Sequence, residues 1–87
     1  MKHCVYILIS KRKTNWSYVG STSNLVQRLK DHNSGKTIST KAFRPLKIVY
    51  TEEHKSRSEA YQRELFLKSG IGREEKNLII SKYSGVV

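Results

Sequence analysis

The feature that most constrains the fold is the apolar run Cys4–Ile9 near the start of the chain. Its residues are apolar at odd and even positions alike, and most are β-branched or aromatic, which is typical of a strand covered on both faces. A chain of 87 residues suits one domain with a thin core. The run is far too short to cross a bilayer. We therefore predict that it forms the central strand of a small sheet.

Two further segments are predicted to pair with this strand. Polar residues 10–15 form a turn, after which Trp16–Ser21 resumes strand-like alternation, so the first two strands make a hairpin. Pro45 marks the entry to a third strand, Leu46–Glu52. With the first strand central, the sheet is mixed or antiparallel and has the spatial order 2-1-3.

The first helix is predicted from N-capping residue types at positions 21–24, which precede a helical pattern. Its apolar stripe comprises Leu25, Val26 and Leu29. Gly35 suits a C-terminal stop, and residues 36–44 are interpreted as a basic loop.

Two later helices complete the predicted fold. Ser56–Glu59 matches the capping-box pattern and opens a helix that runs to about residues 69–70, and a final helix spans Arg73 to Lys82. The order β-β-α-β-α-α predicts an α/β fold of the α+β type, in which a small sheet is flanked by about three helices. Residues 1–87 are expected to form a single domain.

Charge indicates the class of partner. Seventeen Lys and Arg against seven Asp and Glu give a net charge of +10 and a pI of about 10.0. Such an excess attracts a polyanion through phosphate contacts and counterion release. The alternative is a basic protein without a nucleic-acid role. A membrane partner is disfavoured, because no helix combines a basic face with a broad apolar one.

The cysteine content limits other chemistry. Cys4 is the only cysteine, so neither an intrachain disulfide nor a cysteine-based zinc site can form. Its place in an apolar run predicts a buried, inert thiol. No secretion signal follows Met1, and the expected compartment is cytoplasmic.

Glu64 is the residue that fits its helix least well. It falls inside an apolar arc, where a carboxylate is costly unless it is paired or binds a cation. The arc comprises Ala60, Tyr61, Leu65 and Leu67. One interpretation is a pair with Lys68 at i+4, and the other is a metal-binding carboxylate at the base of a cleft. Glu59 and Arg63, by contrast, are expected to form a surface pair.

Arg28 and His32 are four residues apart and share a ridge of the first helix that borders its apolar stripe. Both can therefore reach the rim of the sheet. A guanidinium suits a phosphate, and a histidine can exchange a proton near neutral pH. The plainer interpretation is a solvated arginine and a cation favourable to the helix C-terminus.

Tyr6 and Tyr18 lie on the two strands of the hairpin and can project from the same face. Buried tyrosines are usually core residues with one satisfied hydroxyl. As catalysts they need help, because a free phenol has a pKa of about 10. A nearby arginine and a metal ion would supply that help by favouring the phenolate or a hydrogen-bonded water.

Together these residues resemble the motif that names the GIY-YIG nucleases. The two tripeptides are Cys4–Tyr6 and Tyr18–Gly20, and Arg28 and Glu64 stand where the family has an arginine on the first helix and a metal-binding glutamate on a later one. His32, one turn after the arginine, matches a His or Tyr of many members. The resemblance covers roughly residues 3–82 and is closest to the short stand-alone bacterial members.

The sequence departs from the family pattern at several positions. Cys4 and Val5 replace the Gly and Ile of the first tripeptide, and Ser21 stands where some repair-type members place a lysine. Asn77 is the nearest candidate for an asparagine that often helps to hold the site.

The resemblance implies a metal-dependent endonuclease that hydrolyses phosphodiester bonds in DNA, or in RNA as a second option, with a role in DNA repair or processing. One divalent ion, Mg²⁺ or Mn²⁺, would be held by Glu64 and water, and Arg28 would stabilise the developing phosphate charge. Tyr18 would be the general base or orient the water. Tyr6 and His32 would bind phosphate or relay protons.

Substrate binding is expected from Lys36, Lys41 and Arg44, which would guide the nucleic-acid backbone without reading sequence. Two alternatives remain open at this point. One is a non-catalytic basic module that binds nucleic acid. The other is a subunit that needs a protein partner for activity.

Overall fold

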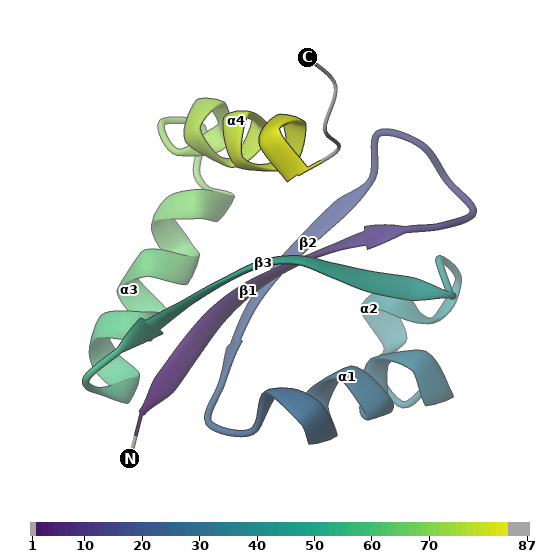
Figure 1. Cartoon of the computed structure of the whole chain (residues 1–87), viewed down its shortest axis with the longest axis horizontal. Coiled ribbons are helices and arrows are strands. Elements are labelled where there is room, and N and C mark those ends of the chain that lie inside the picture. Colours follow the sequence, from purple (N-terminus) through teal and green to yellow (C-terminus); the bar gives the residue numbers. More distant parts are fainter. Residues whose placement is uncertain (1, 84–87) are drawn as a thin grey trace.

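The computed structural model describes residues 2–83 of the chain. Three strands and four helices lie within these residues, and Figure 1 shows their arrangement. In chain order they are β1 (His3–Ser10), β2 (Ser17–Thr22), α1 (Leu25–Ser34), α2 (Ile38–Lys41), β3 (Leu46–His54), α3 (Arg57–Lys68) and α4 (Arg73–Tyr83).

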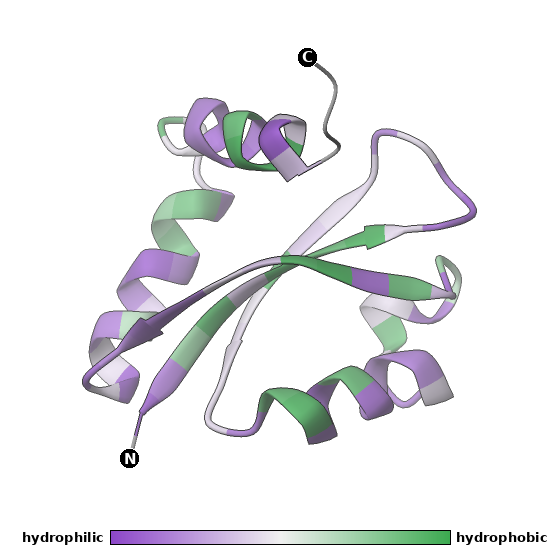
Figure 2. Ribbon diagram, in the orientation of Figure 1, coloured by the Kyte–Doolittle hydropathy of each residue, from purple (hydrophilic) through white to green (hydrophobic). Residues whose placement is uncertain are grey.

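The sheet has the predicted order β2-β1-β3, and both strand pairs are antiparallel. The central position of β1 follows from its double-sided apolar pattern, because Val5–Leu8 is buried on both faces. Figure 2 shows this hydrophobic stretch in the middle of β1. Cys4 is a free thiol that is only half-buried, so the prediction of a buried thiol is wrong.

The two faces of the sheet carry separate cores, because alternate β1 side chains point to opposite faces. One core lies under α3 and α4 and comprises Val5, Ile7, Val19, Ala60 and Leu67. The other lies under α1 and comprises Tyr6, Leu8 and Leu46, with Leu25, Leu29 and Phe43 packed against it. Figure 1 shows α1 and α2 at one side of the sheet and α3 and α4 at the other.

The predicted helix termini are confirmed. The side chain of Asn24 accepts a hydrogen bond from the Gln27 backbone N–H, and Gly35 ends α1 with φ of 87°, a left-handed conformation that glycine adopts readily. Ser56 caps α3 by accepting from the Glu59 N–H at 3.1 Å. Glu59 completes only part of the capping box, since its Oε1 accepts from the Lys55 N–H.

The basic loop predicted for residues 36–44 contains a short helix, α2, so the described residues hold four helices instead of about three. Periodicity cannot reveal a helix of one turn. Its one buried side chain, Thr40, contacts His32 of α1, and this tertiary contact favours the turn.

Two further predictions about helix surfaces are corrected. Val26 is 69% exposed, and Tyr61 and Leu65 are 54% and 47% exposed, although each was assigned to an apolar stripe. On α3 only Ala60 and Leu67, seven positions apart along the same face, are fully buried. The helix therefore meets the sheet along a narrow line.

The predicted pair of Glu59 and Arg63 is also wrong. Arg63 donates instead to Glu52 of β3 and Glu75 of α4, because it lies between these two elements. Among residues 2–83, no helix is long and apolar enough to cross a membrane.

Candidate active site

Tyr6 and Tyr18 project from neighbouring strands on the α1 face of the sheet, as predicted. Their ring centroids are 6.4 Å apart. The ring of His32 lies edge-on to both, at 5.8 Å from Tyr6 and 5.1 Å from Tyr18. The hairpin and α1 thus bring three of the predicted site residues together.

The hydroxyl of Tyr6 is the centre of a buried polar group. Its Oη lies 2.8 Å from His32 Nε2 and accepts a hydrogen bond from Arg28 Nε at 3.3 Å. Tyr6 is only 1% exposed. Arg28 and His32 are one helical turn apart, so α1 delivers both to the same oxygen.

Gly20 makes this position of Tyr6 possible. The two residues are partners across β1 and β2. A Cβ atom at Gly20 would lie 2.5 Å from Tyr6 Oη and 2.6 Å from Tyr6 Cζ, which is closer than non-bonded atoms can approach. The missing side chain lets the phenol ring lie against β2.

His32 reaches the sheet as predicted, but it is fully buried there. Its Nδ1 lies 2.9 Å from Thr40 Oγ1, and that hydroxyl donates to the Thr37 carbonyl at 3.3 Å. Both ring nitrogens therefore have partners within the protein. Sequence reasoning had no signal for Thr40, which stands in a segment without periodicity.

The pKa shifts indicate the charge on each of the three hydrogen-bonded side chains, Tyr6, His32 and Arg28. Burial raises the pKa of Tyr6 to about 12 and outweighs the opposing hydrogen bond from Arg28. Burial, with the charge of Arg28, holds the pKa of His32 below its ordinary value. The hydrogen bond to Tyr6 raises the pKa of Arg28. At neutral pH, Tyr6 and His32 are neutral and Arg28 is charged. Arg28 lowers the pKa of Tyr6 but does not by itself make it a phenolate.

Glu64 forms the ion pair with Lys68 that was one of the two interpretations of its carboxylate. Lys68 donates to Oε2 at 2.6 Å, which is the expected i+4 pair, and the Ser21 hydroxyl donates to Oε1 at 2.7 Å. The side chain of Glu64 is 13% exposed. Lys68 Nζ also lies 5.5 Å from the centroid of the Tyr18 ring, so the pair of Glu64 and Lys68 lies beside β2, near Tyr18.

The donor atoms around Glu64 fit a cation that is bound mainly by water. Among residues 2–83, no cluster of three or more His, Cys, Asp or Glu could hold a metal ion. Magnesium commonly takes one carboxylate, several waters and a substrate phosphate. Each Glu64 oxygen keeps a lone pair beyond the hydrogen bond that it accepts, and the Ser21 oxygen lies beside one of them.

The three residues predicted to contact nucleic acid lie around α2: Lys36 precedes it, Lys41 is its last residue and Arg44 follows it. Arg44 Nε donates to the Lys41 carbonyl at 2.9 Å, and its guanidinium lies against Gly35. Lys36 Nζ is 3.7 Å from Asp31. We call Lys36, Lys41 and Arg44 the basic group.

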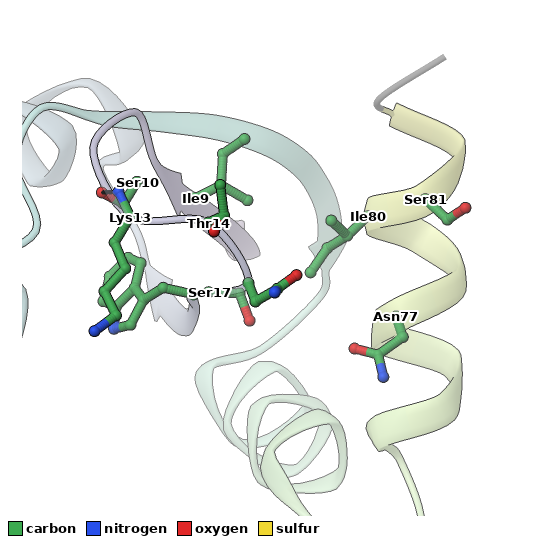
Figure 3. A pocket seen from close by; sticks show the side chains of 10 residues that line it. Ile9, Ser10, Lys13, Thr14, Ser17, Asn77, Ile80 and Ser81 are labelled. Atoms are coloured by element: carbon green, nitrogen blue, oxygen red, sulfur yellow. Dashed lines mark hydrogen bonds between the residues drawn. The ribbon is translucent and has the colours of Figure 1, made fainter. Parts of the chain in front are cut away.

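Asn77 lies apart from these residues. It is exposed on α4 and lines a cavity of about 600 Å³ between α4 and the β1–β2 connection. Figure 3 shows Asn77 and Ile80 projecting from α4 toward that connection. Among the residues that line this cavity, none is Tyr6, Tyr18, Arg28, His32 or Glu64.

The order and position of these residues match a known family. The family described as the GIY-YIG catalytic domain matches residues 2–77. The chain belongs to the GIY-YIG family. This family is one of nucleases, whose substrates are nucleic acids.

Several relatives match nearly the whole of this chain. The chain is 42% identical over 82 residues to a UPF0213 protein of Staphylococcus haemolyticus, covering 93% of this chain and 96% of the relative. It is 36% identical over 81 residues to the UPF0213 protein YazA of Bacillus subtilis, covering 92% and 79%. The NMR structure of a UPF0213 protein from Bacillus halodurans has a TM-score of 0.55 at 34% identity, with 94% of this chain and 86% of that chain covered.

Two residues beside the candidate site were not identified as site residues from the sequence. Ser21 was noted only as a missing lysine, although its alternation with Val19 predicts that it faces α3. Lys68 was considered only as a helix pair, yet it reaches the Tyr18 ring. It provides a cation beside Tyr18, in a family where some members place a lysine at the position of Ser21.

Proposed function

We propose that this chain is a metal-dependent GIY-YIG endonuclease that hydrolyses phosphodiester bonds in DNA, and that residues 1–87 act as one nuclease domain. The observation that carries the proposal is that a charged arginine of α1 donates to Tyr6, while the largely buried carboxylate of α3 is paired with a lysine that lies over the Tyr18 ring. Hydrolysis needs groups that neutralise phosphate charge and groups that handle water.

Arg28 is assigned to the phosphate. Its Nε is held by Tyr6 Oη, and a guanidinium has four further N–H donors on its terminal nitrogens. A planar donor group that is held in place loses little freedom when it binds two phosphate oxygens. Arg28 thus stabilises the charge that develops during cleavage.

The two tyrosines receive different roles. Tyr18 is half-buried and lies between His32 and Lys68, so it is assigned to orient the attacking water or to accept its proton. Tyr6 is enclosed, with a raised pKa. Tyr6 and His32 are therefore assigned to hold Arg28 and not to contact the phosphate directly.

Glu64 is assigned to one divalent ion, Mg²⁺ or Mn²⁺, with Ser21 supporting the carboxylate. When bound, the ion supplies Lewis-acid stabilisation of a phosphate oxygen. Lys68 occupies one carboxylate oxygen and has an exposed side chain that can turn away. The basic group is assigned to the DNA backbone, with RNA as a second substrate and DNA repair or processing as the setting.

One observation favours a second function. Lys68 neutralises Glu64 at 2.6 Å, so the carboxylate also has a purely structural explanation. On that reading the chain is a basic module that binds nucleic acid without cutting it, or a subunit that cuts only with a protein partner.

The test is cleavage of supercoiled plasmid and of branched and single-stranded oligonucleotides, with Mg²⁺, Mn²⁺ or EDTA. We expect metal-dependent cutting that Glu64→Ala reduces by a factor of about 100 or more, as for removal of a key electrostatic group, while DNA binding is retained. Glu74→Ala, an exposed change on α4, is the matched control. Cutting by Glu64→Ala at the wild-type rate would show that the site assignment is wrong. Tight binding without any wild-type cutting would favour the second function.

A further inference from the structure

We infer that Thr40 of α2 is a positioning residue for Arg28, acting through the tautomer of His32 and the hydroxyl direction of Tyr6. This inference rests on the proposed function, in which Arg28 contacts phosphate. The four side chains form one continuous series of hydrogen bonds from the protein interior to the site.

Thr40 sets which partner donates in each hydrogen bond of this series. Its hydroxyl donates to the Thr37 carbonyl at 3.3 Å, and a hydroxyl has a single proton to donate. While Thr40 makes that bond, its oxygen accepts from His32 Nδ1, which lies 2.9 Å away. In this arrangement His32 carries its proton on Nδ1.

The tautomer then fixes the next bond. A neutral imidazole with a proton on Nδ1 has only a lone pair on Nε2, and burial keeps His32 neutral. The Tyr6 hydroxyl, 2.8 Å from Nε2, must donate to it. The lone pairs of Tyr6 Oη are left to accept from Arg28 Nε at 3.3 Å.

The opposite tautomer breaks this order. A proton on His32 Nε2 would donate to Tyr6 Oη and release the Tyr6 proton. Among residues 2–83, the other hydrogen-bond partner of Oη is Arg28 Nε, which is itself a donor. The Tyr6 proton would oppose that N–H or stay buried without an acceptor, and both outcomes are costly. Arg28 is thus held by Tyr6 only when Thr40 accepts from His32.

This role also explains α2. In this helix only Thr40 is buried, and every polar side-chain atom that is buried among the described residues has a partner. The short helix brings one hydroxyl to the inner nitrogen of His32 and leaves Lys41 exposed beside it. It connects the basic group to the buried histidine.

The first test reads the tautomer directly, without any activity. Ring nitrogens of ¹⁵N-labelled histidine are recorded by NMR in wild type, Thr40→Val, Thr40→Ser and Thr37→Val. We expect the Nδ1–H form of His32 in wild type, its loss in Thr40→Val, and its restoration in Thr40→Ser. Thr37→Val is the matched control, because the Thr37 side chain does not cap α2. A wild-type Nε2–H tautomer, or an unchanged tautomer in Thr40→Val, overturns the inference.

The second test measures cleavage by the same variants, each checked for folding by its amide spectrum. We expect Thr40→Val to lose about 10–100-fold in kcat, comparable to the loss of a group that orients a functional histidine, with little change in KM for DNA. Thr40→Ser should recover most of that loss. Full activity in Thr40→Val overturns the inference while the nuclease function stands. Absence of cleavage in wild type overturns the nuclease function, and the tautomer measurement still decides whether Thr40 orders His32.

Discussion

At the scale of single residues, the site depends on a side chain that is missing. Tyr6 lies directly over Gly20, and this close approach puts its hydroxyl within reach of both His32 and Arg28. The glycine of the second tripeptide is therefore needed for space and not for backbone freedom. Gly35, by contrast, is needed for its positive φ.

Gly20→Ala is predicted to displace the Tyr6 ring and break its bond to His32. Because the neighbouring atoms are in a buried sheet, we expect a loss of about 1–3 kcal/mol in the free energy of unfolding, typical of overpacking. The measurement is urea denaturation, together with the NMR signals of the His32 ring. Gly70→Ala is the control, since no atom lies within 4 Å of the position where its Cβ would be. Equal stability of the two variants would contradict this account.

At the scale of elements, one network of charged hydrogen bonds links α3 and α4 to β3. Arg63 of α3 donates to Glu52 of β3 and to Glu75 of α4. Glu52 also accepts from Tyr50 and pairs with His54, both at 2.6 Å. These bonds hold α3, and with it Glu64, at a fixed place beside β2.

The network predicts a loss of stability in acid. Burial alone would raise the pKa of Glu52, but hydrogen bonds from Tyr50, His54 and Arg63 together hold this pKa below its ordinary value of 4.5. The folded state therefore binds a proton at Glu52 less readily than the unfolded state does. Stability from this group is full above pH 4.5 and is lost as the pH falls through the folded pKa.

The measurement is the free energy of unfolding between pH 7 and pH 3, in wild type and in Glu52→Gln. We expect the variant to be less stable at pH 7 and to lose less stability on acidification, because an amide does not titrate. Glu53→Gln, a change at an exposed neighbour whose partner is Lys2, should follow the wild-type curve. Parallel curves for wild type and Glu52→Gln would remove Glu52 as a cause of the acid sensitivity.

At the scale of the whole molecule, the basic residues differ in how close they lie to the candidate site. The chain carries a net charge of +10, and the basic group lies next to the helix that supplies Arg28 and His32. A DNA backbone bound there would run past the site, whereas cations at the start of α3 and α4 lie at the other side of the sheet (Figure 1).

This arrangement predicts how salt affects binding. Each phosphate contact contributes about 0.9 to the slope of log K against log salt concentration. Replacing Lys36, Lys41 and Arg44 by Gln should lower the magnitude of that slope for duplex DNA by up to about 2.7, if each makes one contact. The matched control replaces three exposed cations: Lys55 in the turn before α3, Arg57 on α3 and Arg73 on α4. If the slope falls equally in the two triple variants, the basic group is not a preferred contact surface for DNA.

Patterns within short stretches of sequence determined the sheet order, the antiparallel hairpin and the ends of α1 and α3. The double-sided apolar run made β1 central, and Asn24, Gly35 and Ser56 act through backbone groups a few residues away. The paired tripeptides indicated the family for the same reason. These are local physical constraints, so they can be read without the fold.

Tertiary structure alone decided the rest. Tyr6 meets His32 across 26 positions, and Ser21 meets Glu64 across 43. Helix α2 and the burial of Thr40 depend on such a contact, and Val26 is exposed because α1 meets the sheet along another line. Periodicity shows which side of a helix can be buried. Only packing decides which side is buried, because the cost of an exposed apolar group or an enclosed polar one depends on neighbours that are distant in sequence.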